Sequence, residues 1–337
     1  MKTLFLERGG IGDLLFRIPY YHRFLDGDSA ILCSQRDAEV LRFFLPDGNI
    51  ITYNHNWFLA NPFYRRQILK KAGAPVKKLV ISTPYYHEKT FRIAEKIPSE
   101  KKIAIFEGGR IPDGFTPRPE FTAISGPAGA HYSETVAALF DMAGFELPPN
   151  YRPYEFFRKW RAENVGVTGE EKLAVLQPDA GVYGKRWPEE NWREIAKQIV
   201  PNYKISVVGE TAPDLGQPNA KDGLSRGIAA AFSETLKASM FIGNDTGFTH
   251  LAYLAGIPTV FIAGGGEYGR FCPWPGYNET YGHTVEWVFS PMDCFGCGWD
   301  CRWGDYRKIT PPCIKNISAD AVLEALERLK PPRNYPA

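Results

Sequence analysis

Short apolar segments alternate with amphipathic segments along almost the whole chain, and this alternation constrains the fold more than any other feature. Such a pattern is typical of parallel sheets whose helices cover both faces. The expected strands are Thr3–Leu6, Ser29–Cys33, Lys78–Ser82, Lys101–Phe106, Leu173–Gln177, Lys204–Val208, Met240–Gly243 and Thr259–Ala263. The expected helices are Leu14–Leu25, Glu88–Lys96, His131–Ala143, Pro188–Val200, Ser233–Ala238, Thr246–Ala255 and Ser318–Leu329.

Three prolines interrupt the alternation at residues 147–154, and the pattern restarts after them. Two runs of strands and helices therefore predict an α/β protein with two doubly wound, Rossmann-like domains. We expect an N-terminal domain over residues 1–150, a linker over 151–165, a second domain over 166–317, and a helix with a tail over 318–337. Residues 264–313 are rich in Gly, Trp, Tyr and Cys, and we expect ordered loops there.

The composition excludes several classes of protein. Lys and Arg number 40 against 38 Asp and Glu, so the chain is not a polyanion-coating protein, and no nucleic-acid partner is expected. With 44% hydrophobic residues the chain is not disordered. No apolar stretch approaches the ~18 residues of a membrane-spanning helix. The first residues read as a strand rather than a signal peptide, which predicts a cytoplasmic protein.

A glycine-rich turn, residues 9–13, follows the first expected strand and leads into a helix. It is similar to a phosphate-cradling turn but lacks the G-x-G-x-x-G spacing. Its acid, Asp13, falls at the carboxyl edge of the predicted sheet, where ligands usually bind. An acid would repel a phosphate there, whereas it suits a general base or a group that binds sugar hydroxyls. The alternative is that Asp13 only caps the helix.

The second half carries two candidate anion sites, each before a predicted helix. Residues 244–250 follow a strand, so the helix N-terminus at Thr246 and Gly247 would hold a diphosphate. His250 lies one turn into that helix; it is either a donor to the same anion or a satisfied buried histidine. Lys185 precedes the helix at Pro188 and is our candidate phosphate ligand, whereas we expect Trp187 to pack.

Two further stretches of the second half are less decisive. Glu210 follows a strand, where an acid often binds ribose hydroxyls, and Asp214 competes for that role. The glycines at 264–266 either let a loop approach a ligand closely or form a flexible turn.

A basic window in the first half holds Arg65, Arg66, Lys70, Lys71, Lys77 and Lys78 with no acid between Asp47 and Glu88. It is either a solvated helix face or a patch for an anionic partner. The nearby aromatic residues Trp57, Phe58 and Tyr64 would stack on sugars or contact a membrane surface, though core packing is the commoner fate.

Four of the six cysteines cluster near the C-terminus, at Cys294, Cys297, Cys301 and Cys313. In a reducing compartment this pattern favours a structural metal, zinc or iron, over disulfides. The spacing matches no standard zinc ribbon or finger, so free thiols are the alternative.

Several of these stretches together resemble the ADP-heptose:lipopolysaccharide heptosyltransferases, glycosyltransferase family 9. The matching stretches are GGIGDLLFRIP from Gly9, HYSETVAALFDMAG from His131, LQPDAGVYGKRWPEENW from Leu176 and FIGNDTGFTHLAYLAGIP from Phe241. Their order and spacing cover nearly the whole chain. The resemblance implies the GT-B fold, in which two Rossmann-like domains face a central cleft.

The resemblance also implies an inverting sugar transfer without a catalytic metal. Asp13 then matches the base, and Lys185 the residue that steadies the leaving diphosphate. Asp245, Thr246, Gly247 and His250 match the donor site, and Glu210 the ribose-binding acid. We assign Gly12, Arg65 and Arg66 to the acceptor. The implied partners are a nucleotide-diphosphate sugar and a glycan, lipid-linked or protein acceptor.

One departure from the family pattern is Asp179, which stands where the family usually has glycine, so the donor phosphates or the sugar itself would differ. Two alternatives to a transferase stay open: a sugar-nucleotide epimerase or hydrolase on the same fold, and a scaffold that uses the cysteine cluster and the basic window. A nicotinamide dehydrogenase is disfavoured because the dinucleotide fingerprint is absent. Oligomeric state and peripheral membrane contact are left open.

Overall fold

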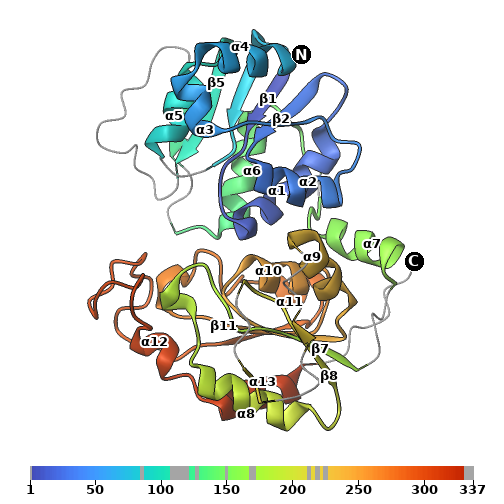
Figure 1. Ribbon diagram of the computed structural model, residues 1–337, viewed down its shortest axis with the longest axis vertical. Coiled ribbons are helices and arrows are strands. Elements are labelled where there is room, and N and C mark those ends of the chain that lie inside the picture. The colour runs from blue at the N-terminus through green and yellow to red at the C-terminus, as the bar shows by residue number, and fades with distance from the viewer. Residues whose placement is uncertain are drawn as a thin grey trace. The chain divides into compact units, whose positions relative to one another are not determined.

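The computed structural model of the chain divides into two compact units, Met1–Pro153 and Tyr154–Ala337 (Figure 1). The structure describes residues 2–83, 87–106, 121–125, 129–148, 151–166, 172–210, 214–216, 221–222 and 227–329. Part of the predicted C-terminal tail, residues 330–337, lies outside this set. Each unit is built around one parallel sheet, as the alternation predicts.

The N-terminal sheet has the order β3-β2-β1-β4-β5-β6, and all of its strand pairs are parallel. Its strands are β1 (Thr3–Leu6), β2 (Ser29–Cys33), β3 (Ile50–Thr52), β4 (Val76–Ile81), β5 (Ser99–Phe106) and β6 (Phe121–Ser125). β1 and β2 are buried along their whole length, because helices cover both faces of the sheet. The strand order reverses between β1 and β4, so the connections that follow these two strands run to opposite faces of the sheet.

The helices of the N-terminal unit are α1 (Ile11–Phe24), α2 (Gln35–Phe44), α3 (His55–Ala60), α4 (Pro62–Lys71), α5 (Glu88–Glu95) and α6 (Tyr132–Met142). Three of them, α1, α5 and α6, were predicted within a few residues. The sequence analysis missed α2, α3, α4, β3 and β6, because these segments are short or carry a weak apolar pattern.

The C-terminal sheet has the order β12-β11-β10-β7-β8-β9, which is the same winding as that of the N-terminal sheet. Its strands are β7 (Leu173–Gln177), β8 (Lys204–Val207), β9 (Lys221–Asp222), β10 (Met240–Asn244), β11 (Thr259–Ile262) and β12 (Val285–Val288). Here the order reverses between β7 and β10. Every strand predicted from the sequence is present within two residues at either end.

The helices of the C-terminal unit are α7 (Glu155–Asn164), α8 (Glu189–Ile199), α9 (Ile228–Lys237), α10 (Gly247–Leu254), α11 (Tyr277–Tyr281), α12 (Pro312–Lys315) and α13 (Ala319–Arg328). Residues 264–313 are not loops alone, because they contain α11, β12 and a short 3-10 turn at Gly265–Glu267. α7 lies in the stretch expected as a linker. Its Arg161 is buried and donates to the carbonyls of Leu236 and Ala238.

No helix among the described parts of the chain has the length and apolar character needed to cross a membrane.

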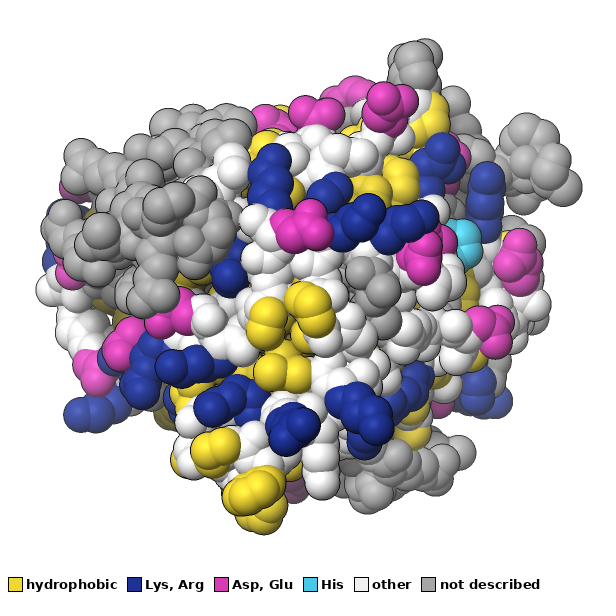
Figure 2. Space-filling view, turned by 90° about the horizontal axis from the view of Figure 1, so that it is seen from above, with side chains coloured by type: hydrophobic (Ala, Val, Ile, Leu, Met, Phe, Trp, Pro, Cys, Tyr) yellow, Lys and Arg dark blue, Asp and Glu magenta, His cyan; other side chains and the backbone are white. Residues whose placement is uncertain are grey.

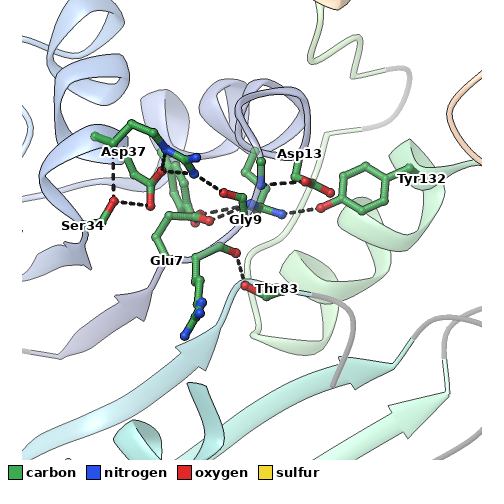
Figure 3. A network of polar contacts seen from close by, with 12 residues as sticks. Glu7, Gly9, Asp13, Ser34, Asp37, Thr83 and Tyr132 are labelled. Carbon is green, nitrogen blue, oxygen red and sulfur yellow. Dashed lines mark hydrogen bonds and ion pairs between the residues drawn. The ribbon is translucent and has the colours of Figure 1, made fainter. Parts of the chain in front are cut away.

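A fully buried ion pair joins β1 to α1 in the N-terminal unit. The carboxylate of Glu7 accepts from the Arg17 guanidinium at 2.6 and 2.9 Å and from the Tyr21 hydroxyl at 2.6 Å. Arg17 also donates to the hydroxyl of Tyr132 on α6 (Figure 3). Because both charges are removed from water, each depends on the other for compensation.

We therefore expect Arg17→Met to lower the free energy of unfolding of the N-terminal unit by about 3–5 kcal/mol, because Glu7 would stay buried without its partner. Urea unfolding measures this loss. Arg23→Met on the same helix is the matched control, since Arg23 is exposed, and it should cost less than about 1 kcal/mol. Equal losses in the two variants would contradict the dependence of the fold on this pair.

Candidate functional site

The C-terminal unit gathers its candidate residues where its strand order reverses, at the carboxyl ends of β7 and β10. Residues 178–185 follow β7, and residues 245–247 follow β10. In an open parallel sheet this point is the usual ligand crevice, because the two connections run to opposite faces.

Lys185 and Asp245 meet at this point and form an ion pair, in which Asp245 is buried and the Lys185 side chain is 19% exposed. The Lys185 Nζ lies 2.8 Å from one Asp245 oxygen, and the His250 Nε2 lies 3.4 Å from the other. Burial alone would raise the pKa of Asp245, but Lys185 and the hydrogen bond from His250 outweigh it and hold that pKa far below its ordinary value. Burial would likewise lower the pKa of Lys185, yet Asp245 and Glu267 raise it. The lysine is therefore a fixed cation.

The N-terminus of α10 lies beside this pair. Thr246 is its N-cap residue, but its side chain does not cap the helix; it donates instead to the Gln177 side chain at 2.9 Å. The first backbone amides of α10, at Gly247 and Phe248, thus have no side-chain cap, and the positive end of the helix dipole adds to the cation of Lys185. This arrangement can hold an anion such as a diphosphate.

His250 is buried on α10 and contacts both the core of the unit and the candidate site. Its Nδ1 lies 3.0 Å from the Tyr253 hydroxyl, while its Nε2 faces Asp245. The imidazole is therefore a satisfied core group, and it also orients the carboxylate that holds Lys185. Its expected role as a donor to a bound anion stays a prediction.

The sequence analysis missed Trp299 and Glu267, which complete the surroundings of Lys185. The Trp299 ring centroid lies 5.3 Å from the Lys185 Nζ, and its indole N–H donates to Glu267 at 2.8 Å. Trp299 has φ 69°, a left-handed conformation that is unusual for a bulky residue. Strained backbone of this kind concentrates at functional sites. The neighbouring glycines, Gly296 and Gly298, are the sequence signal that could have indicated an unusual backbone conformation at Trp299.

The three glycines 264–266 make room for packed side chains of the protein. A Cβ at Gly266 would lie 2.6 Å from the Trp299 ring, and one at Gly265 would lie 2.8 Å from Phe295. The segment around the cysteines therefore packs directly on this backbone, which corrects the expectation of a flexible turn. The expected close approach of this loop to a ligand stays a prediction.

Asp179 organises the loops after β7 and β8. Its carboxylate accepts from the amides of Ala180 and Glu210, each at 2.8 Å, and pairs with Arg186 at 3.0 Å. Glu210 is thus tied to the site through its backbone while its side chain is exposed, and Asp214 is exposed as well. Neither acid is distinguished as the ribose ligand. Trp187 packs as expected, since it is buried and donates to the Ile317 carbonyl at 2.8 Å.

The four clustered cysteines, Cys294, Cys297, Cys301 and Cys313, share one neighbourhood as free thiols. Burial raises the pKa of Cys313, and the charges of the other three would raise it further. Metal binding requires thiolates, and across the described ranges no group of three or more His, Cys, Asp or Glu side chains is placed to hold a metal ion. The prediction of zinc or iron is therefore not supported, and no step below uses a metal.

In the N-terminal unit, Asp13 lies on the first turn of α1, after β1 (Figure 3). Its Oδ2 accepts from the Gly10 amide at 2.8 Å, so the carboxylate does cap the helix. No hydrogen bond to its Oδ1 occurs among the residues that the structure describes. Asp13 is half-buried, and this second oxygen can accept a proton from a ligand. Gly12, beside it, is also partly exposed.

The basic window lies on α4 and β4. Arg65 donates to the carbonyls of Phe58 and Leu59 at the end of α3, at 3.3 and 3.4 Å, whereas Arg66 is exposed. Trp57 and Phe63 are exposed near them, and Figure 2 shows hydrophobic side chains beside Lys and Arg on this end of the molecule. Phe58 is buried, so core packing is correct for that residue.

From the ion pair we expect Asp245→Asn to lower the free energy of unfolding by about 3–5 kcal/mol near neutral pH. The folded pKa of Asp245 lies below its ordinary 3.8, so the loss should be full above about pH 4 and shrink as the pH falls further. The raised pKa of Lys185 keeps the loss constant up to about its ordinary 10.5. Urea unfolding from pH 3 to 9 measures it; a loss that grew toward pH 3 would contradict the pairing.

Comparison with known proteins finds similarity in sequence to a heptosyltransferase. No family model matches the sequence. Lipopolysaccharide heptosyltransferase 1 of Pseudomonas aeruginosa is 24% identical over 221 residues, which cover 60% of this chain. The match spans 59% of that relative, less than two thirds of its length.

Solved structures of the same kind share the fold. The Escherichia coli heptosyltransferase WaaC with ADP has a TM-score of 0.66 at 15% identity, over 98% of this chain and all of the other. A glycosyl transferase family 9 protein from Veillonella parvula has a TM-score of 0.64 at 15% identity, over 97% and 96%. An iron-containing dodecameric glycosyltransferase, TibC of E. coli, is also similar, with a TM-score of 0.50 at 16% identity over 97% and 77%.

These likenesses confirm the predicted fold class, GT-B with two parallel Rossmann-like sheets. The chain is similar in sequence to a heptosyltransferase, and it shares its fold with heptosyltransferases and a glycosyl transferase family 9 protein.

Proposed function

We propose that the protein is an inverting glycosyltransferase that moves heptose from ADP-heptose to a hydroxyl of a glycan, lipid-linked or protein acceptor in the cytoplasm. The observation that carries the proposal is the largely buried Lys185–Asp245–His250 group beside the uncapped N-terminus of α10. It holds the ammonium of Lys185 in place next to the positive end of the helix dipole, at the switch point of the C-terminal sheet. It suits the diphosphate of a nucleotide sugar, and a similar fold has been solved with ADP.

In the proposed reaction the acceptor oxygen attacks the anomeric carbon of the donor sugar from the face opposite the diphosphate. The bond between that carbon and the diphosphate oxygen breaks, and its electron pair leaves with the diphosphate. Lys185 and the amides of Gly247 and Phe248 stabilise the charge that develops there. Asp245 and His250 keep the ammonium of Lys185 in place, so no reorganisation is needed as the charge grows.

We assign the general base to Asp13, because its Oδ1 can take the proton of the attacking hydroxyl while Oδ2 stays bound to the Gly10 amide. Inversion follows from this single displacement, since the base acts on the acceptor and no sugar–enzyme bond forms. Glu210 and Asp214 stay as candidate ribose ligands, and Arg65 and Arg66 as candidate acceptor contacts.

Asp13→Asn should lower the rate of sugar transfer by about 10²–10⁴-fold, as loss of a general base does. The amide oxygen of asparagine can still accept from Gly10, so folding and donor binding should be unchanged. Asp47→Asn, at an exposed position, is the matched control with full activity. Product analysis by mass spectrometry measures the rate. Free sugar or an epimer formed without acceptor would instead favour the hydrolase or epimerase alternative.

Among nucleotide diphosphates, ADP should stabilise the chain selectively. At a concentration 100-fold above its Kd a ligand adds about 2.7 kcal/mol of stability, which corresponds to a rise of roughly 5–10 °C in melting temperature for a unit of this size. UDP and GDP at the same concentration should give much smaller rises. Lys185→Met should abolish the ADP effect, and equal rises for all three nucleotides would contradict the donor assignment.

A further inference from the structure

Seven buried side-chain polar atoms in the N-terminal unit have no hydrogen-bond partner among the described residues, and four of them lie at one edge of the sheet. They are the NH1 of Arg8, the hydroxyl of Tyr53, the Nε2 of His55 and the Nδ1 of His87. Native proteins leave few buried polar groups unsatisfied, so four in one neighbourhood require an explanation.

The sheet topology brings these residues together. Arg8 follows β1, Tyr53 and His55 follow β3, and His87 lies on the connection from β4 to α5. All three strands are parallel, so their carboxyl ends share one edge of the sheet. This edge includes the point between β1 and β4 where the strand order reverses, the usual place for a ligand in such a sheet.

One ring contact and the charge effects agree with this placement. The rings of Tyr53 and His55 lie 4.7 Å apart. The charge of Arg8 acts to lower the pKa of Tyr53, His55 and His87 alike. The Thr83 hydroxyl donates to the Arg8 carbonyl and ties the ends of β1 and β4 together (Figure 3). Arg8, His55 and His87 are partly exposed, so a solute can reach the cluster, whereas Tyr53 is 5% exposed.

The cluster is rich in donors and positive charge. Burial raises the pKa of Tyr53, so its phenol stays a donor. Burial lowers the pKa of His55 and His87, and Arg8 adds to this effect, so both imidazoles are neutral and each can donate one N–H. Arg8 has no ion pair within the described residues.

The neighbouring acids are already engaged. The charge of Asp37 acts to raise the pKa of His55, but the Asp37 carboxylate is already paired with Arg36 at 2.9 Å. Glu7 is taken by Arg17. The Nζ of Lys89 lies 2.9 Å from the Asn56 side chain and adds positive charge at the edge of the cluster.

We propose that Arg8, Tyr53, His55 and His87 form a subsite for an anionic oxygen group, a phosphate or a carboxylate, carried by the sugar acceptor. The oxygens of such a group accept hydrogen bonds, so it would satisfy donors of the cluster and compensate the charge of Arg8. Asp13 belongs to the same strand–turn–helix connection as Arg8. The subsite would therefore hold the acceptor near the proposed base, and in this respect it rests on the proposed function.

Binding of simple sugars to the full chain, without any nucleotide sugar, tests the subsite. Glucose 6-phosphate and glucuronate present the two anions, and glucose is the neutral control. NMR of labelled histidines should show shifts of the His55 and His87 imidazole signals with at least one anion and none with glucose. The anion that binds more tightly names the group. No shift with either anion would overturn the proposal and leave the cluster as a water-filled or merely buried one.

Two variants separate binding from folding. Tyr53→Phe removes a hydroxyl that has no partner in the described structure, so it should leave the melting temperature unchanged and weaken anion binding at least 10-fold. Arg8→Gln should weaken it further. Arg92→Gln, an exposed arginine on α5, should bind within 2-fold of wild type. Unaltered binding in Tyr53→Phe and Arg8→Gln would overturn the assignment.

A kinetic measurement links the subsite to catalysis. Tyr53→Phe should raise the KM for an anionic acceptor at least 10-fold and leave kcat within 3-fold. If anion binding behaves as expected but no ADP-sugar is turned over, the subsite stands and the proposed function fails. If transfer occurs with an unchanged KM in Tyr53→Phe, the proposed function stands and the role of the subsite in acceptor binding fails.

Discussion

A parallel sheet whose strand order reverses has one point on its carboxyl edge where adjacent connections run to opposite faces, and the candidate sites of both units lie at such points. In the N-terminal sheet the point lies between β1 and β4, and in the C-terminal sheet between β7 and β10. The backbone hydrogen bonds between neighbouring strands end there, so polar side chains and free amides can face a ligand rather than a neighbouring strand. The strand order of each sheet therefore determines where the candidate site of that unit lies.

Charge compensation distinguishes the two points. At the C-terminal point, Lys185 and Asp245 compensate each other inside the protein, and the pair is held ready for a further anion by the dipole of α10. In the N-terminal unit, Glu7 and Arg17 compensate each other, whereas Arg8 has no ion pair among the residues that the structure describes. A buried donor without a partner is costly unless a ligand or water completes it, and the NH1 of Arg8 is such a donor.

The sequence was sufficient for the elements with strong patterns and insufficient for contacts between distant segments. Strands such as Leu173–Gln177 follow from their apolar runs, and Asp13, Lys185 and Asp245 follow from their positions at strand ends or before helices. The pairing of Lys185 with Asp245 joins residues 60 positions apart, and no local pattern encodes it. Trp299 was missed for the same reason, because its partners Gly266 and Glu267 lie far from it in sequence. The run of basic residues pointed to Arg65 and Arg66 as acceptor contacts. The donors without a partner, on Arg8, Tyr53, His55 and His87, follow three separate strands, so no local sequence pattern indicates them.

The glycines at 264–266 show that a run of glycines does not by itself indicate a flexible segment. Because Ile314, Phe295 and Trp299 fill the space where side chains at these three positions would stand, any replacement would displace packed protein, although glycine runs are usually treated as freely variable spacers. Any methyl group added at Gly266 would lift the indole of Trp299 away from Lys185. Divergence among sequences of this type should therefore be slow at these glycines and faster at the bulky residues on the outer surface of the same segment.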